Sequence, residues 1–228
     1  MAKQKKNSNY STEKKQAKEA KAAEIKRKEQ MAKTVKLVAI WAGGALLLIA
    51  LVVGLLFALG VFDYVPEATY HASFTFSDGN TIHVELYGND APETVEHFID
   101  LCESDYFTDK TLRSMLDGML KLGSGTADGG DLGIKGEFSD NGFDNQIPMK
   151  RGYIGLSRGA SADSGYGQFF ILTSDRRDLQ GKYAIFGGVT DMSVVDAMLS
   201  KLTVNKDGTI YEGDAPRILS VSLHAAHH

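Results

Sequence analysis

The strongest constraint on this chain is a run of 26 residues, 37–62, that contains no charged side chain. About 20 consecutive apolar residues are enough to cross the hydrocarbon core of a bilayer as a helix. The run therefore predicts a single transmembrane helix with some room for tilt. A cleaved signal peptide is the alternative, although the apolar region of such a peptide is normally only about 7–15 residues long.

Charge divides the chain on the two sides of this run. Residues 1–36 hold 12 Lys and Arg against 4 Asp and Glu, whereas the rest of the chain holds 13 against 25. The positive-inside rule then puts the basic arm, residues 1–36, in the cytoplasm and the acidic C-terminal part outside the cell membrane. We expect no nucleic-acid partner, because the arm offers no pattern of stacking aromatic side chains.

The apolar run also predicts what it contacts. Residues 37–62 are expected to lie against membrane lipid. Within them Ala50, Gly54 and Ala58 recur every four residues, a spacing that lets two helices approach closely. Small residues are common in such helices, so we predict only weak self-association. A short linker, residues 63–69, then leads to the C-terminal domain.

Residues 70–228 are predicted to form that domain from short strands. Phe74 and Phe76, and then Ile82, Val84 and Leu86, alternate on the two sides of a Ser-Asp-Gly-Asn turn, which predicts a hairpin. Further apolar runs at 153–156, 169–172 and 183–186 predict more strands. A helix is expected from Asp90, which is suited to cap it, and a second over 193–201. The pattern favours a mainly β fold, a closed antiparallel barrel of about eight strands with two helices.

Several enzyme classes lack their motifs here. The sequence has no Gly-x-Ser-x-Gly elbow and no His-Glu-x-x-His pair, and its Gly-rich stretch 123–133 is not followed by Gly-Lys-Ser/Thr. The single cysteine, Cys102, is predicted to be a buried apolar side chain. His224, His227 and His228 are expected to form a solvated tail. We therefore expect no metal and no cofactor.

Four segments carry a resemblance to a known family. Residues 84–87 with 90–98 resemble the first strand and helix of cyclophilins, and Ile-Lys-Gly-Glu-Phe at 134–138 followed by Asn-Gly is similar to the bacterial branch. Residues 167–171, Gly-Gln-Phe-Phe-Ile, and 178–187 are similar to that family's Ser-Gln-Phe-Phe-Ile and Leu-Asp-Gly-Lys-His-x-x-Phe-Gly blocks. The resemblance implies a cyclophilin barrel and peptidyl-prolyl cis-trans isomerase activity that assists folding of exported proteins.

Isomerisation explains why no nucleophile or metal is needed. Rotation about an X–Pro bond has a barrier of about 18–20 kcal/mol, and no covalent bond has to break. A guanidinium that hydrogen-bonds around the prolyl nitrogen favours the twisted amide. By resemblance, Arg113 supplies this group and Gln168 holds it. The resemblance also implies a substrate-binding set that comprises Phe170, Leu179, Tyr183, either Met119 or Leu120, and the Ser157-Arg158 edge.

The same comparison shows departures from the family pattern. Thr111-Leu112 stand where the family has Phe-His before the arginine, and residues 117–124 replace its Gly-Phe-Met-x-Gln-Gly-Gly-Asp block. One aromatic wall and one glutamine are therefore missing. Two hypotheses follow: an active isomerase of proline-containing polypeptides, or a catalytically weak or inactive module of the same fold that binds peptides as a chaperone.

Overall fold

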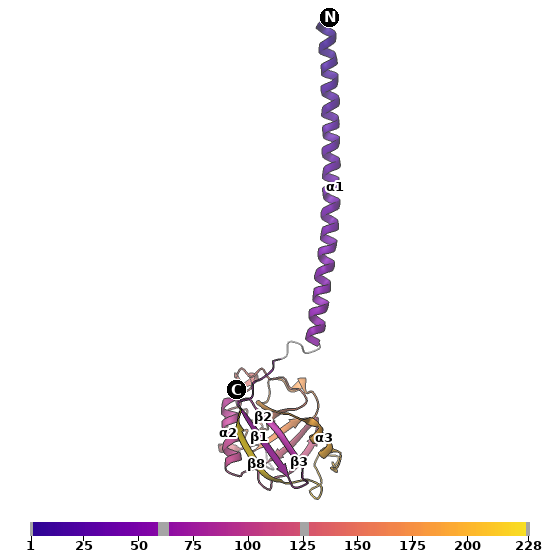
Figure 1. Cartoon of the computed structure of the whole chain (residues 1–228). Helices are drawn as coiled ribbons and strands as arrows, with labels where there is room; N and C mark the ends of the chain where they lie inside the picture. Colours follow the sequence, from indigo (N-terminus) through magenta and orange to yellow (C-terminus); the bar gives the residue numbers. More distant parts are fainter. Residues whose placement is uncertain (1, 59–63, 124–127, 227–228) are drawn as a thin grey trace. The chain divides into compact units, whose positions relative to one another are not determined.

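The computed structural model describes residues 2–58, 64–123 and 128–226 (Figure 1). It divides the chain into two units, Met1–Asp63 and Tyr64–His228. In the first unit, helix α1 spans Ala2–Ala58. Its stretch Lys26–Leu56 is long and apolar enough to cross a membrane by length and composition, properties that a signal sequence near an N-terminus shares. The predicted span overlaps this stretch, and its residues 59–62 lie outside the described residues.

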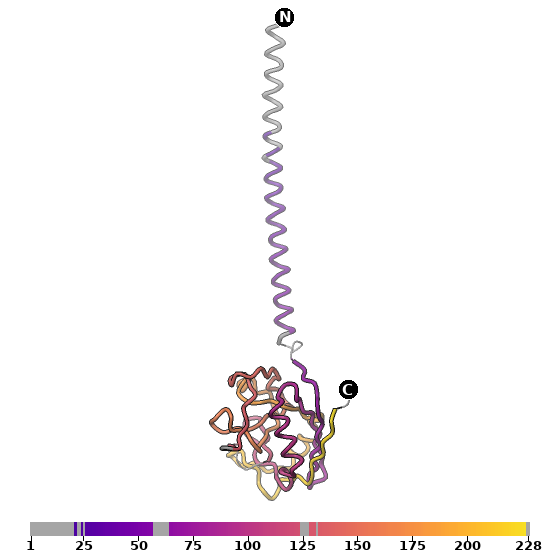
Figure 2. The backbone as a smooth tube through the Cα atoms, turned by 90° about the vertical axis from the view of Figure 1, so that its left-hand side faces the viewer, coloured from indigo at the N-terminus to yellow at the C-terminus, as the bar shows by residue number. Residues whose placement is uncertain are grey.

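The second unit is built on one curled antiparallel sheet (Figure 1). Its spatial strand order is β3-β4-β6-β5-β7-β2-β1-β8. Figure 2 shows that the first and last strands of the domain, β1 and β8, run side by side. The strands are β1 Tyr70–Phe76, β2 Thr81–Leu86, β3 Leu112–Leu116, β4 Met119–Gly123, β5 Tyr153–Leu156, β6 Gln168–Leu172, β7 Ile185–Val189 and β8 Ile218–Ala225.

The prediction of a closed barrel is wrong, because the sheet remains a half-barrel. Between its two edges, within the described residues, there is only an isolated bridge from Thr111 to Arg217. The outer edge of β3 is instead bonded to the segment around Thr209, which bridges to Ser114. The Met115 amide donates to the Gly208 carbonyl at 2.7 Å. Because these bonds occupy the edge of β3, β8 cannot pair along it.

The predicted hairpin and both predicted domain helices are confirmed. Strands β1 and β2 pair with Phe74 opposite Ile82 around the 77–80 turn. Helix α2 spans Pro92–Glu103 and helix α3 spans Met192–Leu199. The α3 N-terminus is capped by Asp191, whose carboxylate accepts from the Ser193 amide at 2.9 Å. Three short 3-10 helices, Gly130–Leu132, Ser139–Asn141 and Arg177–Leu179, lie in the long connections.

The predicted capping of α2 by Asp90 is wrong. No side chain at the N-cap position bonds to this helix. Its first amides are satisfied by Glu137, whose carboxylate accepts from the Glu93 amide at 3.0 Å and from the Thr94 amide and hydroxyl at 2.8 and 2.6 Å. The free amides of a helix N-terminus favour a negative charge, and Glu137, 2% exposed, supplies it from 43 residues along the chain.

Two apolar clusters lie on opposite faces of the sheet. The main core lies inside the curl against α2 and holds Phe74, Phe98, Phe107, Phe169 and Phe186. Cys102 is buried there, as predicted, and burial raises the pKa of its thiol to about 12. The second cluster, which we call the outer cluster, consists of Tyr87, Ile147, Met149, Phe170, Leu172 and Ile185. The alternation of side chains along a strand separates Phe169 from Phe170 in this way.

The described part of the predicted linker, residues 64–69, lies on the domain. The Thr69 amide donates to the Leu86 carbonyl at 2.8 Å, and the Thr69 hydroxyl accepts from the Gly88 amide at 2.9 Å. Ala68 packs against the outer cluster. A hydrogen bond to Asp90 raises the pKa of Tyr64. These contacts fix the start of the domain next to the outer face of its sheet.

Candidate active site

The outer face of β3, β4 and β6 carries the candidate site. In β4 and β6 the main core takes Leu120, Leu122, Phe169 and Ile171, so the residues between them face outward. In the β4–β6 register, Gly123 lies opposite Gln168 and Lys121 lies opposite Phe170. Because cross-strand partners point to the same face, Lys121, Gln168 and Phe170 share the outer face.

Arg113 joins this face through a β-bulge. The β3–β4 register pairs Leu112 with Leu122 and Ser114 with Lys121, so Arg113 is the extra residue. Its side chain is exposed and borders a cavity of about 600 Å³ that Gly123 also lines. Gly123 has a positive φ, and a side chain there would collide with the Gly167 carbonyl, so only glycine fits this end of β4. Residues 124–127, which follow Gly123, lie outside the described residues.

Phe170 forms the floor of the outer cluster. It is 1% exposed and meets the ring of Tyr183 edge to face, with 5.4 Å between centroids. Met119, Leu179 and Tyr183 are half-buried and pack against the same cluster. A ligand can therefore reach the Phe170 ring only when a side chain that covers it, such as Tyr183, moves aside.

Comparisons with known proteins agree on one family. A sequence model described as cyclophilin type peptidyl-prolyl cis-trans isomerase/CLD matches residues 71–222, which include almost the whole sheet. The chain belongs to this cyclophilin-type isomerase family. A cyclophilin-type isomerase of Cryptosporidium parvum, solved in the presence of the dipeptide Ala-Pro, shares the fold with a TM-score of 0.58 and 18% identity, over 68% of this chain and 99% of that one.

Three curated relatives each match about 63% of this cyclophilin. Peptidyl-prolyl cis-trans isomerase CYP57 of Arabidopsis thaliana is 33% identical over 63% of this chain but only 30% of its own length. Peptidyl-prolyl cis-trans isomerase 10 of Caenorhabditis elegans is 31% identical over 63% of this chain and 89% of its own. An isomerase of Helicobacter pylori is 31% identical over 63% and 85%.

The cyclophilin structure places some of the predicted binding residues beside Phe170 and one of them in the main core. Met119 lies with the outer cluster, whereas Leu120 belongs to the main core, so only Met119 lies beside Phe170. The guanidinium of Arg158 stacks on the ring of Tyr183 at 5.1 Å and donates to the Lys182 carbonyl at 3.0 Å. Arg158 therefore supports the Tyr183 side of the cluster.

Ser157 and Gln168 are joined through the backbone of the cyclophilin sheet. The Ser157 amide donates to the Gln168 carbonyl at 2.8 Å. The Ser157 hydroxyl is buried and has no hydrogen-bond partner within the described residues. Gln168 is 6% exposed at the start of β6. The described structure thus brings Gln168 to the side of Gly123, but it does not bring Arg113 into one cavity with Phe170.

Lys121 was missed by the sequence reasoning, which treated it only as part of a replaced block. It lies on β4 between the strands that carry Arg113 and Phe170. The alternation of Leu120 and Leu122 with Met119, Lys121 and Gly123 was the available signal, because it assigns Lys121 to the outer face. A second cation therefore lies next to the predicted proline slot.

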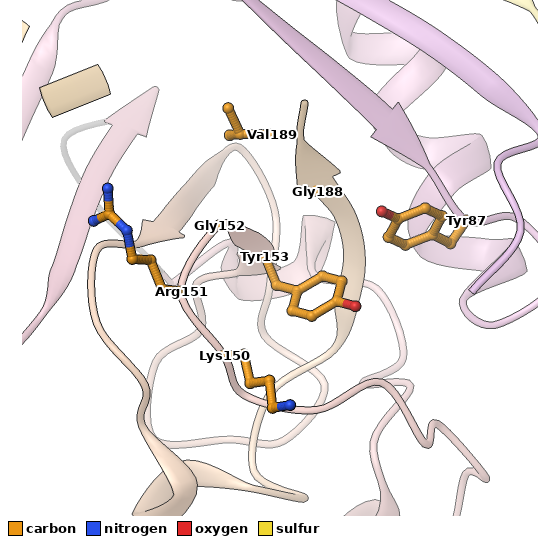
Figure 3. A pocket seen from close by; sticks show the side chains of 7 residues that line it. All are labelled: Tyr87, Lys150, Arg151, Gly152, Tyr153, Gly188 and Val189. Atoms are coloured by element: carbon orange, nitrogen blue, oxygen red, sulfur yellow. The ribbon is translucent and has the colours of Figure 1, made fainter. Parts of the chain in front are cut away.

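A second cavity of about 350 Å³ lies farther along the outer face, over β5 and β7 (Figure 3). Tyr87 and Tyr153 extend toward it from opposite sides, with their ring centroids 6.2 Å apart. Burial raises the pKa of both phenols, and Glu85 raises it further. Arg151 points away and pairs with Asp196 at 2.7 Å. The phenols stay protonated and can act as neutral donors in this cavity, which Lys150 also lines.

Proposed function

We propose that this cyclophilin catalyses cis-trans isomerisation of X–Pro bonds in polypeptides. The observation that carries the proposal is the shared outer face of β3, β4 and β6, where Arg113 lies at the bulge opposite Lys121, Lys121 pairs with Phe170, and Gln168 lies two residues before Phe170. Membership of the isomerase family supports it. The Ala-Pro dipeptide present with the Cryptosporidium parvum relative supports proline-containing peptides as substrates.

In this mechanism the proline ring rests on Phe170 after Tyr183, Leu179 or Met119 has moved aside. Arg113 then donates from its planar guanidinium to the twisted amide, whose prolyl nitrogen has regained its lone pair. Gln168 holds the substrate backbone or the guanidinium in place. No bond is made or broken, and the donors lower a barrier of about 18–20 kcal/mol because they bind the twisted state more strongly than the planar one.

The test is the exchange rate of a proline peptide in the presence of the full-length chain in neutral detergent micelles. Uncatalysed exchange takes tens to hundreds of seconds, so catalysis is visible by two-dimensional exchange NMR. We expect cross-peaks between the cis and trans forms at substoichiometric protein. Exchange no faster than in detergent alone would contradict the proposal.

One observation favours a second function, that of a peptide-binding or chaperone module with weak or no catalysis. Phe170 is 1% exposed, and Leu112, which replaces a family histidine, lies in the main core. A slot that opens rarely would bind proline peptides weakly and turn them over slowly. Saturable shifts of peptide NMR signals without faster exchange would support this function.

We further propose that the cyclophilin domain works at the outer side of a cell membrane on exported proteins. The basic arm and the apolar part of α1 support a single-pass anchor with a cytoplasmic N-terminus, in contact with lipid along residues 37–62. The Helicobacter pylori relative supports a bacterial-type domain. Protease added to intact cells should remove the domain and spare the arm, and protection of the domain would contradict this topology.

The anchor also carries the proposal of weak self-association through Ala50, Gly54 and Ala58. All three residues lie in α1, one turn apart. Gly54→Leu and Ala50→Leu should reduce any cross-linked dimer in membranes, whereas Leu51→Ala, off the stripe, should not. Equal dimer yields for all three variants would contradict the role of the small residues.

A further inference from the structure

The cavity beside Arg113 gathers cations in a domain that is otherwise acidic. Lys110, Arg113 and Arg217 line it, together with the carboxylates Asp109 and Glu212. Beyond residue 36 the chain has 13 Lys and Arg against 25 Asp and Glu. The cavity therefore carries three positive and two negative side chains, an excess of one positive charge on a domain whose net charge is negative.

The two arginines have no ionic partner within the described part of the chain. Arg113 and Arg217 make no side-chain hydrogen bond and no ion pair there, although two carboxylates line the same cavity. The Lys110 ammonium lies over the Tyr106 ring at 5.0 Å. The exposed ion pairs elsewhere on the domain, Arg151 with Asp196 and Arg176 with Asp178, show that such charges do pair where geometry allows.

The backbone holds the two guanidinium groups on the same side. Thr111 and Arg217 form an antiparallel bridge, and the Arg217 amide donates to the Ser77 hydroxyl at 3.0 Å. Arg113 lies two residues beyond Thr111, so it is the diagonal neighbour of Arg217 on the outer face, roughly 7–8 Å away at the backbone. Like charges at this spacing repel one another unless an anion lies between them. Two planar forks so arranged fit a carboxylate.

We propose that this cavity is a subsite for an acidic side chain, Asp or Glu, of the proline-containing substrate. This inference rests on the proposed isomerase function and adds a substrate preference to it. Arg217 and Lys110 hold the carboxylate, and Arg113 lies between this subsite and the proline slot. Asp109 and Glu212 oppose a second negative charge, so one acidic residue near the proline is preferred over a run of them.

The strand order sets how far the acidic residue lies from the proline. The backbone positions of Phe170 on β6 and Arg217 are separated by β4 and β3, which makes three strand spacings or about 14 Å. The arginine side chain reaches back over part of this distance. An extended peptide advances about 3.3 Å per residue, so the acidic residue lies about two to four residues from the proline.

The experiment compares peptides that differ at one position. Peptides with Glu, Gln or Lys at the third residue before or after proline are assayed by exchange NMR with the full-length chain in neutral micelles. For one of the two placements we expect kcat/KM for Glu to exceed that for Gln by about 3- to 10-fold, the size of one partly exposed charge-assisted contact. The preference should shrink as salt rises to about 0.3 M, because screening weakens exposed charges.

Two variants separate the subsite from general charge. Arg217→Gln should bring the Glu-to-Gln ratio to about one, and its fold should survive because only the Arg217 backbone is bonded. Lys201→Gln removes the same charge from an exposed position that does not line the cavity, and its ratio should equal that of the wild type. A Glu-to-Gln ratio below about two-fold in both placements, or equal loss in both variants, would overturn the subsite.

The outcomes also separate this inference from the proposed function. Equal catalysis of Glu and Gln peptides overturns the subsite and leaves the isomerase. If no peptide is isomerised, the isomerase proposal fails, and the subsite is then judged by dissociation constants from NMR titrations of the same peptides. A Glu preference in binding that Arg217→Gln removes supports the subsite, and its absence overturns it.

Discussion

Phe169 and Phe170 are consecutive, both nearly fully buried, and lie on opposite faces of β6. Phe169 packs in the main core, with ring centroids 5.3 to 5.7 Å from three other phenylalanines, whereas Phe170 packs under Tyr183 in the outer cluster. Replacing a buried phenylalanine by alanine typically costs about 3–5 kcal/mol. Leucine keeps most of the apolar volume, so Phe169→Leu and Phe170→Leu should each lower the free energy of unfolding by about 1–2 kcal/mol.

The two variants should differ in function although their stability losses match. Phe170→Leu should reduce kcat/KM for proline peptides by about 5- to 30-fold, the equivalent of about 1–2 kcal/mol of lost contact with the ring. Phe169→Leu should stay within about two-fold of the wild type. Urea unfolding gives the stabilities and exchange NMR gives the rates. If Phe169→Leu loses as much activity as Phe170→Leu, the outer face is not the proline slot.

Three further predictions test the surroundings of the site. Glu137→Ala leaves the first amides of α2 and the Thr94 hydroxyl without their acceptor, so the free energy of unfolding in urea should fall by about 2–5 kcal/mol. The control Glu96→Ala, on the same helix, should lower it by less than about 0.5 kcal/mol. Equal losses in the two variants would refute the capping role of Glu137. Burial lowers the pKa of His97 from 6.5, so the unfolded chain binds the imidazole proton more tightly than the folded one. The free energy of unfolding should therefore fall as the pH drops below about 6.5, and it should fall less steeply in His97→Gln. Identical slopes for the two proteins would show that His97 does not contribute. A Cβ at Gly155 would overlap the Phe170 ring, so Gly155→Ala should cost about 1–3 kcal/mol in urea unfolding and slow isomerisation, and unchanged stability and rate would contradict this packing.

Local patterns predicted the parts of the fold that depend on neighbours in sequence. The β1–β2 hairpin follows from alternation around one turn, and helix α3 follows from the apolar side chains within 193–201. The cap of α2 could not be predicted in this way, because Glu137 reaches the helix from a loop that is distant in the sequence. No local pattern favours Glu137 over Asp90 as the capping residue. Closure of the barrel was mispredicted for a similar reason, since the edge of β3 is occupied by the segment around Thr209.

Candidate site residues could be named from the sequence, but their arrangement in space could not. Family blocks suggested Arg113, Gln168 and Phe170 as candidates, yet the bulge at Arg113 depends on a register shift with β4 that these blocks do not show. The choice between Met119 and Leu120 required the same register. Arg217 was not singled out at all, because the bridge to Thr111 joins positions that are far apart in the sequence.

The central claim is that Arg113 stabilises the twisted prolyl amide, and its direct measurement is the isomerisation rate of wild type against Arg113→Ala. Loss of a donor aimed at developing charge typically costs about 100- to 1,000-fold in rate. The melting temperature should hardly change, because the Arg113 side chain is exposed. Arg113→Lys should recover little, since one ammonium cannot reproduce the planar fork. Equal and substantial rates for wild type and Arg113→Ala would contradict the claim.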